Sequence, residues 1–210
     1  MIKIIITDDH PIVRKGLKEI LAETKDIFSV DEAGNGWEVL EKVGKTDYDV
    51  VVLDLSMPGM SGLEVLKQLK KKKSSVPILV LSRHPEEQYA VRVLKAGADG
   101  YLTKESAPNE LALAIQKVAR GGKYISASLA DQLASYVKDE SEKKPHERLS
   151  DREFQVMSML ASGKTVGEIA REMALSVNTI STYRLRILEK MKLTNNAQIM
   201  HYALNEKLID

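Results

Sequence analysis

The sequence predicts an α/β domain with a doubly wound parallel sheet, followed by a smaller all-helical domain. From residue 1 to about residue 122, short runs rich in Ile and Val alternate with segments whose apolar residues recur at helical spacing, which is the pattern of βαβ units. Beyond Gly122 the strand-like runs stop, and helical spacing continues towards the end of the chain. At 210 residues the chain is long enough for two domains, each with its own core.

Five short β-branched runs are the predicted strands. Right-handed crossovers and burial on both faces lead us to expect a flavodoxin-like sheet with the strand order 2-1-3-4-5. A last helix is expected from Pro108 to Arg120. The predicted strands are Lys3 to Thr7, Phe28 to Ala33, Asp49 to Leu53, Pro77 to Leu81 and Gly100 to Thr103.

Three domain-level segments are expected, with boundaries at 1–121, 122–148 and 149–210. The middle segment should contain a helix from Ser126 to Val137 and then an exposed linker, because DESEKKPHER combines charge with a proline and lacks apolar periodicity. The last segment is helical throughout, and we expect it to form a four-helix domain.

Composition excludes several classes of protein. With 43% hydrophobic and 29% charged residues and a net charge of +1, the chain is a typical folded protein rather than a disordered one. The absence of cysteine excludes disulfides and cysteine-ligated metals. No apolar run approaches the roughly 20 residues needed to cross a membrane. We therefore expect a cytoplasmic protein without a membrane partner.

Polar residues stand where four of the predicted strands end. In an open parallel sheet, ligands bind outside the carboxyl ends of the strands. Strands one, three, four and five are neighbours in the expected order, so three carboxylates, hydroxyl groups and an ammonium group converge on one edge. These residues are Thr7, Asp8, Asp9, Asp54, Ser82, Thr103 and Lys104.

Asp54 is the candidate reactive group at this edge. Burying an unpaired carboxylate is costly, so we expect Asp54 just past the end of its strand rather than buried within it. The Asp54 carboxylate is repelled by those of Asp8 and Asp9, so we expect a cation that offsets the repulsion. Mg²⁺ is the expected cation because it takes oxygen ligands and commonly bridges carboxylates to a phosphate. Lys104 supplies a second positive charge. The site therefore suits an aspartate that accepts a phosphoryl group as a nucleophile.

The residues alone leave other functions open. Asp8 or Asp9 could cap the helix that begins near His10. A hydrolase of phosphate esters could also use Asp54 as its nucleophile, with the helical domain as a cap, although Ser56 stands where such enzymes commonly carry a general acid. A nucleotide-binding domain is disfavoured because no Gly-rich loop follows the first strand.

The histidines near this edge are not expected to bind metal. His10 and His84 are interpreted as loop or helix-start residues, because no second histidine lies at ligand spacing from either.

The helical segment contains a predicted helix-turn-helix. One helix begins after Ser150, which is followed by Glu153 in a capping box, and ends at Gly163. A short helix from Thr165 to Met173 and a longer, basic one that begins at Val177 then meet at a tight turn.

The longer helix has an outward face that suits the major groove of DNA. At 100° per residue, Ile180, Ile187 and Met191 share the face that meets the core. Short polar groups towards bases and basic groups towards phosphates describe a DNA reader, although a helical bundle that binds another protein fits the same pattern. The outward residues are Asn178, Ser181, Thr182, Leu185 and Glu189. The flanking basic residues are Arg184, Arg186, Lys190 and Lys192, which only Glu189 opposes.

About the first 120 residues resemble the receiver domain of two-component response regulators. The stretches TDDHPIVRKGL, VVVLDLSMPGMSGLEVL, ILVLS and ADGYLTKES carry the resemblance. It implies a CheY-like fold in which Asp54 accepts a phosphoryl group from a sensor histidine kinase. The implied Mg²⁺ ligands are Asp8, Asp9, Asp54 and the backbone carbonyl of Ser56, and the implied catalytic and switch residues are Lys104, Ser82 and Tyr101.

The helical segment is similar to the LuxR-type output domain, so the whole chain resembles the NarL/FixJ family, and TYRLRI is most like its GacA/UvrY branch. The resemblance implies a transcription regulator rather than an enzyme, apart from self-catalysed phosphoryl acceptance. We expect phosphorylation to draw Ser82 and Lys104 towards Asp54 and to let Tyr101 swing inward. The expected output is release of the helical domain or formation of a homodimer that reads paired half-sites in double-stranded DNA.

Overall fold

The computed structural model describes residues 2–24, 27–73, 75–127, 129–131, 133 and 144–209. The chain divides into two compact units, Met1–Asp131 and Gln132–Asp210. Of the predicted helix from Ser126 to Val137, residues 126–127, 129–131 and 133 are described, and all of these except Ser126 are helical; the rest of this segment and the first part of the predicted linker lie outside the described residues.

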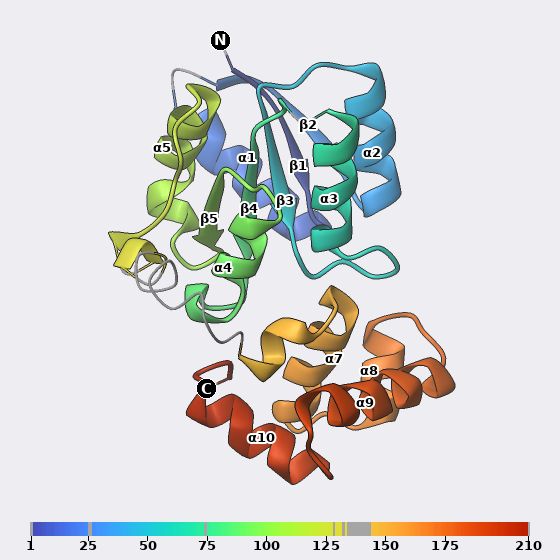
Figure 1. The fold of residues 1–210 in the computed structure, drawn as a ribbon. Coiled ribbons are helices and arrows are strands. Elements are labelled where there is room, and N and C mark those ends of the chain that lie inside the picture. Colours follow the sequence, from blue (N-terminus) through green and yellow to red (C-terminus); the bar gives the residue numbers. More distant parts are fainter. Residues whose placement is uncertain are drawn as a thin grey trace. The chain divides into compact units, whose positions relative to one another are not determined.

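The first unit is a five-stranded parallel sheet with helices on both faces (Figure 1). The strand order β2-β1-β3-β4-β5 confirms the predicted order. The strands are β1 (Ile2–Thr7), β2 (Ile27–Ala33), β3 (Val50–Asp54), β4 (Ile78–Ser82) and β5 (Gly100–Thr103). The helices are α1 (Pro11–Ala22), α2 (Gly36–Lys45), α3 (Gly62–Lys72), α4 (Glu86–Lys95) and α5 (Ala107–Ala119).

The sheet core explains why the central strands are so apolar. All five residues of β3 and all five of β4 are buried, because helices cover both faces of a parallel sheet. On one face, α1 and α5 pack Leu17, Leu21, Leu111 and Ile115 against the strands. At about 25 cal/mol per Å² of buried apolar surface, this packing is the main stabilising contribution to the unit.

Two strands begin and end one residue later than predicted, which changes the location of two site residues. Asp54 is the last residue of β3 and Ser82 the last of β4. In the sheet register Asp54 lies beside Leu81, and Ser82 lies beside Thr103. Both side chains therefore belong to buried strand ends.

The turn after β3 returns closely against the strand end. The Gly62 N–H donates to the carbonyl of Leu55 at 3.0 Å, and Ser61 caps α3 in a capping box with Glu64. A Cβ atom on Gly62 would lie 2.0 Å from the carbonyl oxygen of Asp54. Only glycine permits this approach of two backbone segments, which fixes the loop beside Asp54.

The second unit is helical and contains the predicted helix-turn-helix. Its helices are α7 (Asp151–Ala161), α8 (Val166–Glu172), α9 (Val177–Met191) and α10 (Asn196–Asn205), preceded by a 3₁₀ helix, η1 (Pro145–Arg148). The capping box of Ser150 and Glu153 is present, and Ser176 caps α9 by accepting from the Thr179 N–H. These helix starts confirm the predictions from the capping residues.

The end of the predicted linker is not an exposed, unstructured segment. Pro145–Arg148 forms η1, and the half-buried His146 lies with its Nδ1 2.8 Å from the hydroxyl of Tyr202 in α10.

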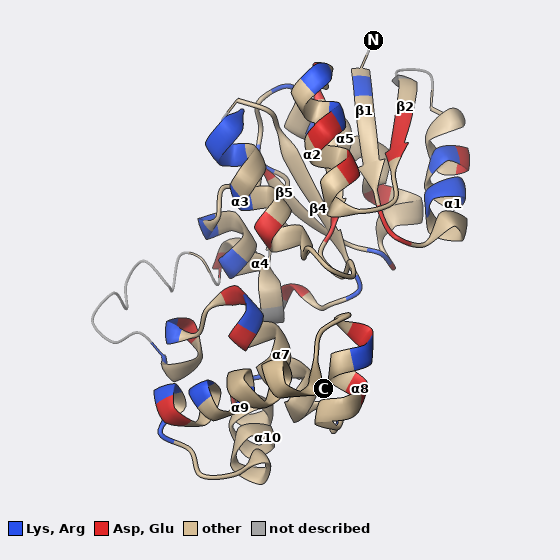
Figure 2. Cartoon of the chain, turned by 90° about the vertical axis from the view of Figure 1, so that its right-hand side faces the viewer, with Lys and Arg blue, Asp and Glu red and all other residues tan. Residues whose placement is uncertain are grey.

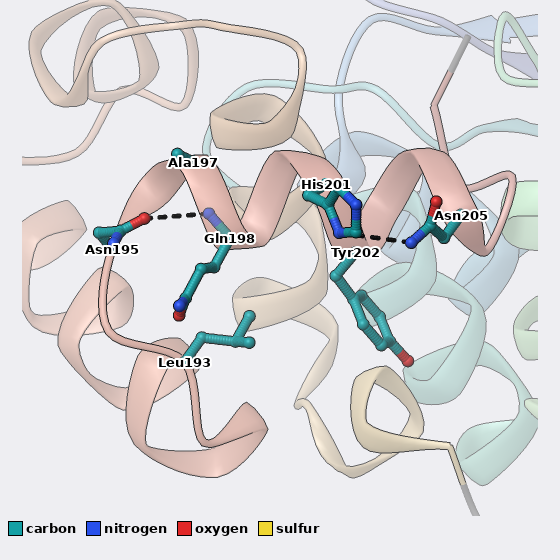
Figure 3. Close-up of a pocket in the computed structure, with 7 residues that line it drawn as sticks. All are labelled: Leu193, Asn195, Ala197, Gln198, His201, Tyr202 and Asn205. Atoms are coloured by element: carbon teal, nitrogen blue, oxygen red, sulfur yellow. Dashed lines mark hydrogen bonds between the residues drawn. The ribbon is translucent and has the colours of Figure 1, made fainter.

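A pocket of about 660 Å³ lies along α10 (Figure 3). It is lined by Leu193, Asn195, Ala197, Gln198, His201, Tyr202 and Asn205.

Basic and acidic residues are distributed over both units (Figure 2), with a basic stretch at the end of α3 formed by Lys70, Lys71 and Lys72. In the part of the chain that is described, no helix has the length and apolar character needed to traverse a lipid bilayer.

The close approach at Gly62 gives a test of the fold. We expect Gly62→Ala to lower the free energy of unfolding by about 3 kcal/mol, because the new Cβ must displace the backbone of Asp54. Gly16→Ala is the matched control, since that glycine lies in α1 with no heavy atom near its Cβ position; we expect a gain of about 0.5–1 kcal/mol. Urea denaturation followed by circular dichroism measures both. Equal stability of the Gly62→Ala and wild-type proteins would contradict the account.

Candidate functional site

A lysine bridges two buried carboxylates at the carboxyl edge of the sheet. The Lys104 Nζ donates to Asp8 Oδ2 at 2.5 Å and to Asp54 Oδ2 at 2.8 Å. Asp8 follows β1, Asp54 ends β3 and Lys104 follows β5, where its N–H donates to the Ser82 carbonyl at 2.7 Å. The sheet order therefore brings together residues that are 50 and 96 positions apart in the chain.

The expectation that Asp54 lies outside the buried strand is wrong. Asp54 and Asp8 are each only 1% exposed. Asp54 tolerates burial because Lys104 pairs with one oxygen and the Ser56 N–H donates to the other at 3.2 Å. Burial raises the pKa of the Asp54 carboxyl above its usual value; Lys104 opposes this effect, and repulsion from Asp8 adds to it.

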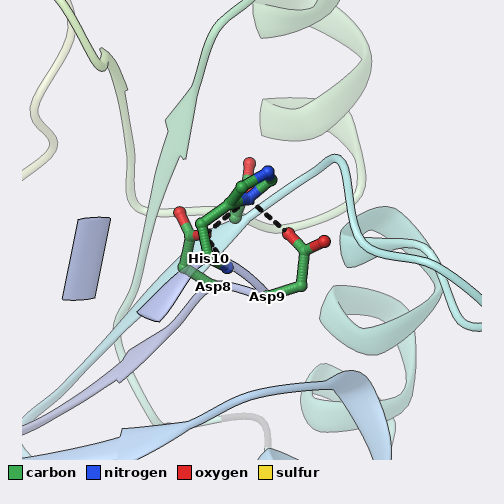
Figure 4. Close-up of side chains that lie close together, drawn as sticks. Asp8, Asp9 and His10 are labelled. Atoms are coloured by element: carbon green, nitrogen blue, oxygen red, sulfur yellow. Dashed lines mark hydrogen bonds and ion pairs between the residues drawn. The ribbon is translucent and has the colours of Figure 1, made fainter. Parts of the chain in front are cut away.

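Asp9 and His10 complete a group of possible metal ligands (Figure 4). Candidate ligand atoms of Asp8, Asp9, His10 and Asp54 all lie within 4.8 Å of one another. Asp9 Oδ1 is shielded from water and has no hydrogen-bond partner among the described residues, although it lies 2.9 Å from His10 Nδ1. An oxygen in this position suits a divalent cation, so this acidic cluster is compatible with Mg²⁺.

The start of α1 shows what Asp8 and His10 contribute to the beginning of this helix. His10 is the N-cap residue of α1, as expected for a helix-start residue, and makes no side-chain capping bond. Asp8 Oδ1 accepts from the His10 N–H at 2.8 Å. Asp8 therefore orders the turn before α1 with one oxygen and pairs with Lys104 through the other.

Ser82 and Tyr101 meet at the backbone of His84. The Ser82 hydroxyl oxygen accepts from the His84 N–H at 3.0 Å, and the Tyr101 hydroxyl donates to the His84 carbonyl at 2.7 Å. Both side chains are fully buried, and burial raises the pKa of the Tyr101 hydroxyl well above its usual value. The tyrosine ring is thus already inside in this structure, whereas we expected phosphorylation to bring it there.

The place of His84 was not evident from the sequence. Its ring stacks near that of Tyr89 with centroids 4.6 Å apart, and its Nε2 lies 3.4 Å from the Ser56 hydroxyl. No spacing signal marked it, because the contact with Ser56 joins the loops after β3 and β4, while Tyr89 lies in α4. Thr103 is not brought into the carboxylate cluster, since its hydroxyl donates to Ser106 at the start of α5.

In the second unit, α9 presents a mostly polar outward face. Ile180, Ile187 and Met191 are buried, which confirms the predicted core side of this helix. On the other side, four of the five predicted outward residues are exposed and Ser181 is half-buried. The exposed ones are Asn178, Thr182, Leu185 and Glu189.

Two of the four predicted flanking cations are engaged within the unit. Lys190 pairs with Glu153 of α7 at 2.6 Å, and Arg184 donates to the Asn196 side chain of α10 at 2.6 Å. The expectation that only Glu189 opposes these cations is therefore wrong. Glu153 was interpreted as a capping residue, and it both caps α7 and pairs with Lys190.

The remaining two cations, Arg186 and Lys192, are exposed and have no ion-pair partner among the described residues. Glu189 is the acidic residue of α9, beside the basic residues Arg184, Arg186 and Lys190, and Figure 2 shows both kinds of charge on this helix. Although burial acts to raise it, the pKa of Glu153 is held below its usual value by Lys190 and by the hydrogen bonds from Ser150. Glu153 thus stays ionised and offsets the charge of Lys190.

Comparison with known families identifies both units. Residues 4–116 match the response regulator receiver domain, and residues 147–203 match the bacterial regulatory proteins of the luxR family. The chain belongs to the response regulators of the NarL/FixJ family. It is therefore a two-component response regulator with a receiver domain and a LuxR-type helix-turn-helix domain, and its family is one of transcription regulators.

Similar proteins match the chain over nearly its full length. The response regulator UvrY of Escherichia coli is 36% identical over 99% of this chain and 96% of its own. The response regulator GacA of Pseudomonas aeruginosa is 34% identical over 100% of this chain and 99% of its own. A structure of RcsB from Salmonella enterica serovar Typhimurium, bound to the promoter rprA with the phosphomimetic BeF3⁻, is 27% identical, covers 96% of this chain and 98% of that one, and has a TM-score of 0.66.

The buried Asp54 carboxyl in the receiver domain should make stability depend on pH. Because its pKa is raised in the folded state, the folded protein binds more protons than the unfolded chain above about pH 4, and stability falls as pH rises towards the folded pKa. We expect Asp54→Asn to stabilise the protein at pH 7 by on the order of 1 kcal/mol, since Lys104 keeps Asp8 as a partner. The gain should shrink as pH falls towards 4.

Asp99→Asn is the matched control of opposite sign. Burial acts to raise the pKa of Asp99, but ion pairs with Lys123 and Lys70 hold it below its usual value. The stability from Asp99 is present above its unfolded pKa and is lost as pH falls through the folded pKa. Asp99→Asn should therefore destabilise at pH 7. Urea denaturation of both variants between pH 4 and 8 tests this, and a destabilised Asp54→Asn protein at pH 7 would contradict it.

Proposed function

We propose that Asp54 accepts a phosphoryl group from a sensor histidine kinase and that this modification controls sequence-specific binding of promoter DNA. The observation that carries the proposal is the buried pair of carboxylates, Asp8 and Asp54, held by Lys104 beside Asp9. The receiver resemblance assigns phosphoryl transfer to the same residues, which supports the proposal.

The chain supplies the nucleophile and much of the charge neutralisation. A carboxylate oxygen of Asp54 attacks the phosphorus of a phosphohistidine, forming the P–O bond while the P–N bond breaks and its electron pair leaves with the imidazole nitrogen. Lys104, whose ammonium group pairs with Asp54 in this structure, would bind an oxygen of the transferred phosphoryl group. We propose that Asp8, Asp9, Asp54 and the Ser56 carbonyl hold Mg²⁺, which would neutralise the phosphoryl charge.

The loop between β4 and α4 is the element that we expect to respond. If the Ser82 hydroxyl turns to donate to a phosphoryl oxygen, its present bond with the His84 N–H is lost or weakened. The carbonyl of His84 also accepts a hydrogen bond from the Tyr101 hydroxyl. A phosphoryl charge added at Asp54 would in this way change the conformation of the loop before α4 and of the surface around that helix.

The proposed output is DNA binding by α9. Support comes from the luxR-family match and from the RcsB structure that is bound to a promoter. We propose segments 1–121, 122–148 and 149–210 as receiver, connector and DNA-binding domain. We also propose that the protein forms a homodimer on paired half-sites, and that it works in the cytoplasm, where kinase and DNA are both available. Its only catalysis would be its own phosphorylation.

Phosphorylation of Asp54 can be measured directly. We expect acetyl phosphate with Mg²⁺ to add one phosphoryl group to the chain, detected by intact mass and by retardation on a phosphate-binding gel. Asp54→Asn should abolish the addition, whereas Asp99→Asn, which removes a carboxylate paired with Lys70 and Lys123, should retain it. Chelating Mg²⁺ should lower the rate at least tenfold because repulsion around Asp54 is then poorly offset. A phosphorylated Asp54→Asn protein would overturn the assignment.

DNA binding is tested by selecting fragments from genomic DNA with and without acetyl phosphate and Mg²⁺. Specific fragments should be retained, and phosphorylation should change their affinity in the wild type but not in Asp54→Asn. If neither form prefers any fragment over random sequence, the proposal fails.

The ion pairs of α9 predict which cations contribute to salt dependence. We expect Arg186→Ala to reduce the slope of log K against log salt concentration by about 1 per bound subunit, because an exposed arginine can neutralise a phosphate. Lys190→Ala should leave the slope unchanged and lower the free energy of unfolding by about 1–2 kcal/mol, because Glu153 remains buried without its ammonium partner. Equal slopes for Arg186→Ala and wild type would contradict this division.

A further inference from the structure

Leu185 is an apolar side chain at the centre of the outward face of α9. It is 63% exposed, between Thr182 and Glu189, which are also exposed. The helix is held to its unit through Ile180 and Ile187 on the opposite side. A single exposed leucine is common on protein surfaces, so its meaning depends on what its neighbours can offer a ligand.

Several neighbours of Leu185 have their hydrogen-bond donors engaged within the unit, whereas the exposed Arg186 beside it is the residue that we assign to a DNA phosphate. The Thr182 hydroxyl donates to the Asn178 carbonyl within the helix at 2.9 Å, which turns its polar group towards the backbone and leaves its methyl group to the exposed side. Arg184 is engaged with Asn196, and Lys190 with Glu153. The middle of the face is therefore apolar, with the Asn178 amide before it and the Glu189 carboxylate after it.

Only one feature of a base pair in the major groove matches such a surface. Most groups on the base edges are hydrogen-bond donors and acceptors, and burying these against leucine would leave them without partners. The C5-methyl group of thymine is the one apolar group that a base pair presents in the major groove. We propose that Leu185 contacts the methyl group of a thymine in each half-site, and thereby selects thymine at that position. This inference rests on the proposed DNA binding.

Replacing thymine by deoxyuridine removes the methyl group and leaves base pairing intact, so it tests the contact directly. A binding site is first selected from a random DNA library with the full chain treated with acetyl phosphate and Mg²⁺. Each thymine of the selected half-site is then replaced singly by deoxyuridine. We expect one replacement to weaken binding of the wild type about fourfold, as for the loss of one buried methyl group.

Leu185→Ala should bind more weakly and should no longer distinguish thymine from deoxyuridine at that position, while other positions are unaffected. Leu204→Ala is the matched control, because Leu204 is a leucine of α10 that is 48% exposed; it should keep the wild-type discrimination. Circular dichroism verifies that both variants fold.

The outcomes separate this inference from the function on which it rests. Specific binding without deoxyuridine sensitivity at any position, or sensitivity that Leu185→Ala retains, overturns the role of Leu185 and leaves the proposed function intact. Failure to select any sequence overturns the DNA-binding function itself, and the inference falls with it.

Discussion

The ammonium group of Lys104 between Asp8 and Asp54 is the interaction on which the receiver domain depends. Two carboxylates that are each 1% exposed are tolerable only because one cation reaches both of them. That contact requires β1, β3 and β5 to end at one edge of the sheet, so the strand order and register bring the three charged groups together. The loop after β3 is held in turn by the backbone approach at Gly62.

Much of this arrangement could be predicted from the sequence, because apolar strand runs and strand-end polar residues are local signals. The strand order followed from right-handed crossovers, and the helix starts at Ser150 and Ser176 followed from capping chemistry. The burial of Asp54 could not be predicted, since it depends on donors from Lys104 and from the turn at Ser56. A one-residue shift of the strand end is below what periodicity resolves.

The pairing of Glu153 with Lys190 shows the same limit in the LuxR-type domain. The helical period correctly assigns Ile180 and Ile187 to the core, because burial depends on position along one helix. Which cations remain available for a phosphate depends instead on contacts between helices, and α7 and α10 engage two of the four. Charge counted along one helix therefore overstates the positive charge that the outward side of α9 presents.

The contacts around residue 84 have a consequence for how the receiver tolerates sequence change. Both the bond to Ser82 and the bond from Tyr101 are made by the main chain of this residue, through its N–H and its carbonyl. Every amino acid except proline carries both groups. The link between the strand-end hydroxyl and the buried tyrosine is thus independent of the side chain at this position, which leaves that side chain able to vary without breaking the link.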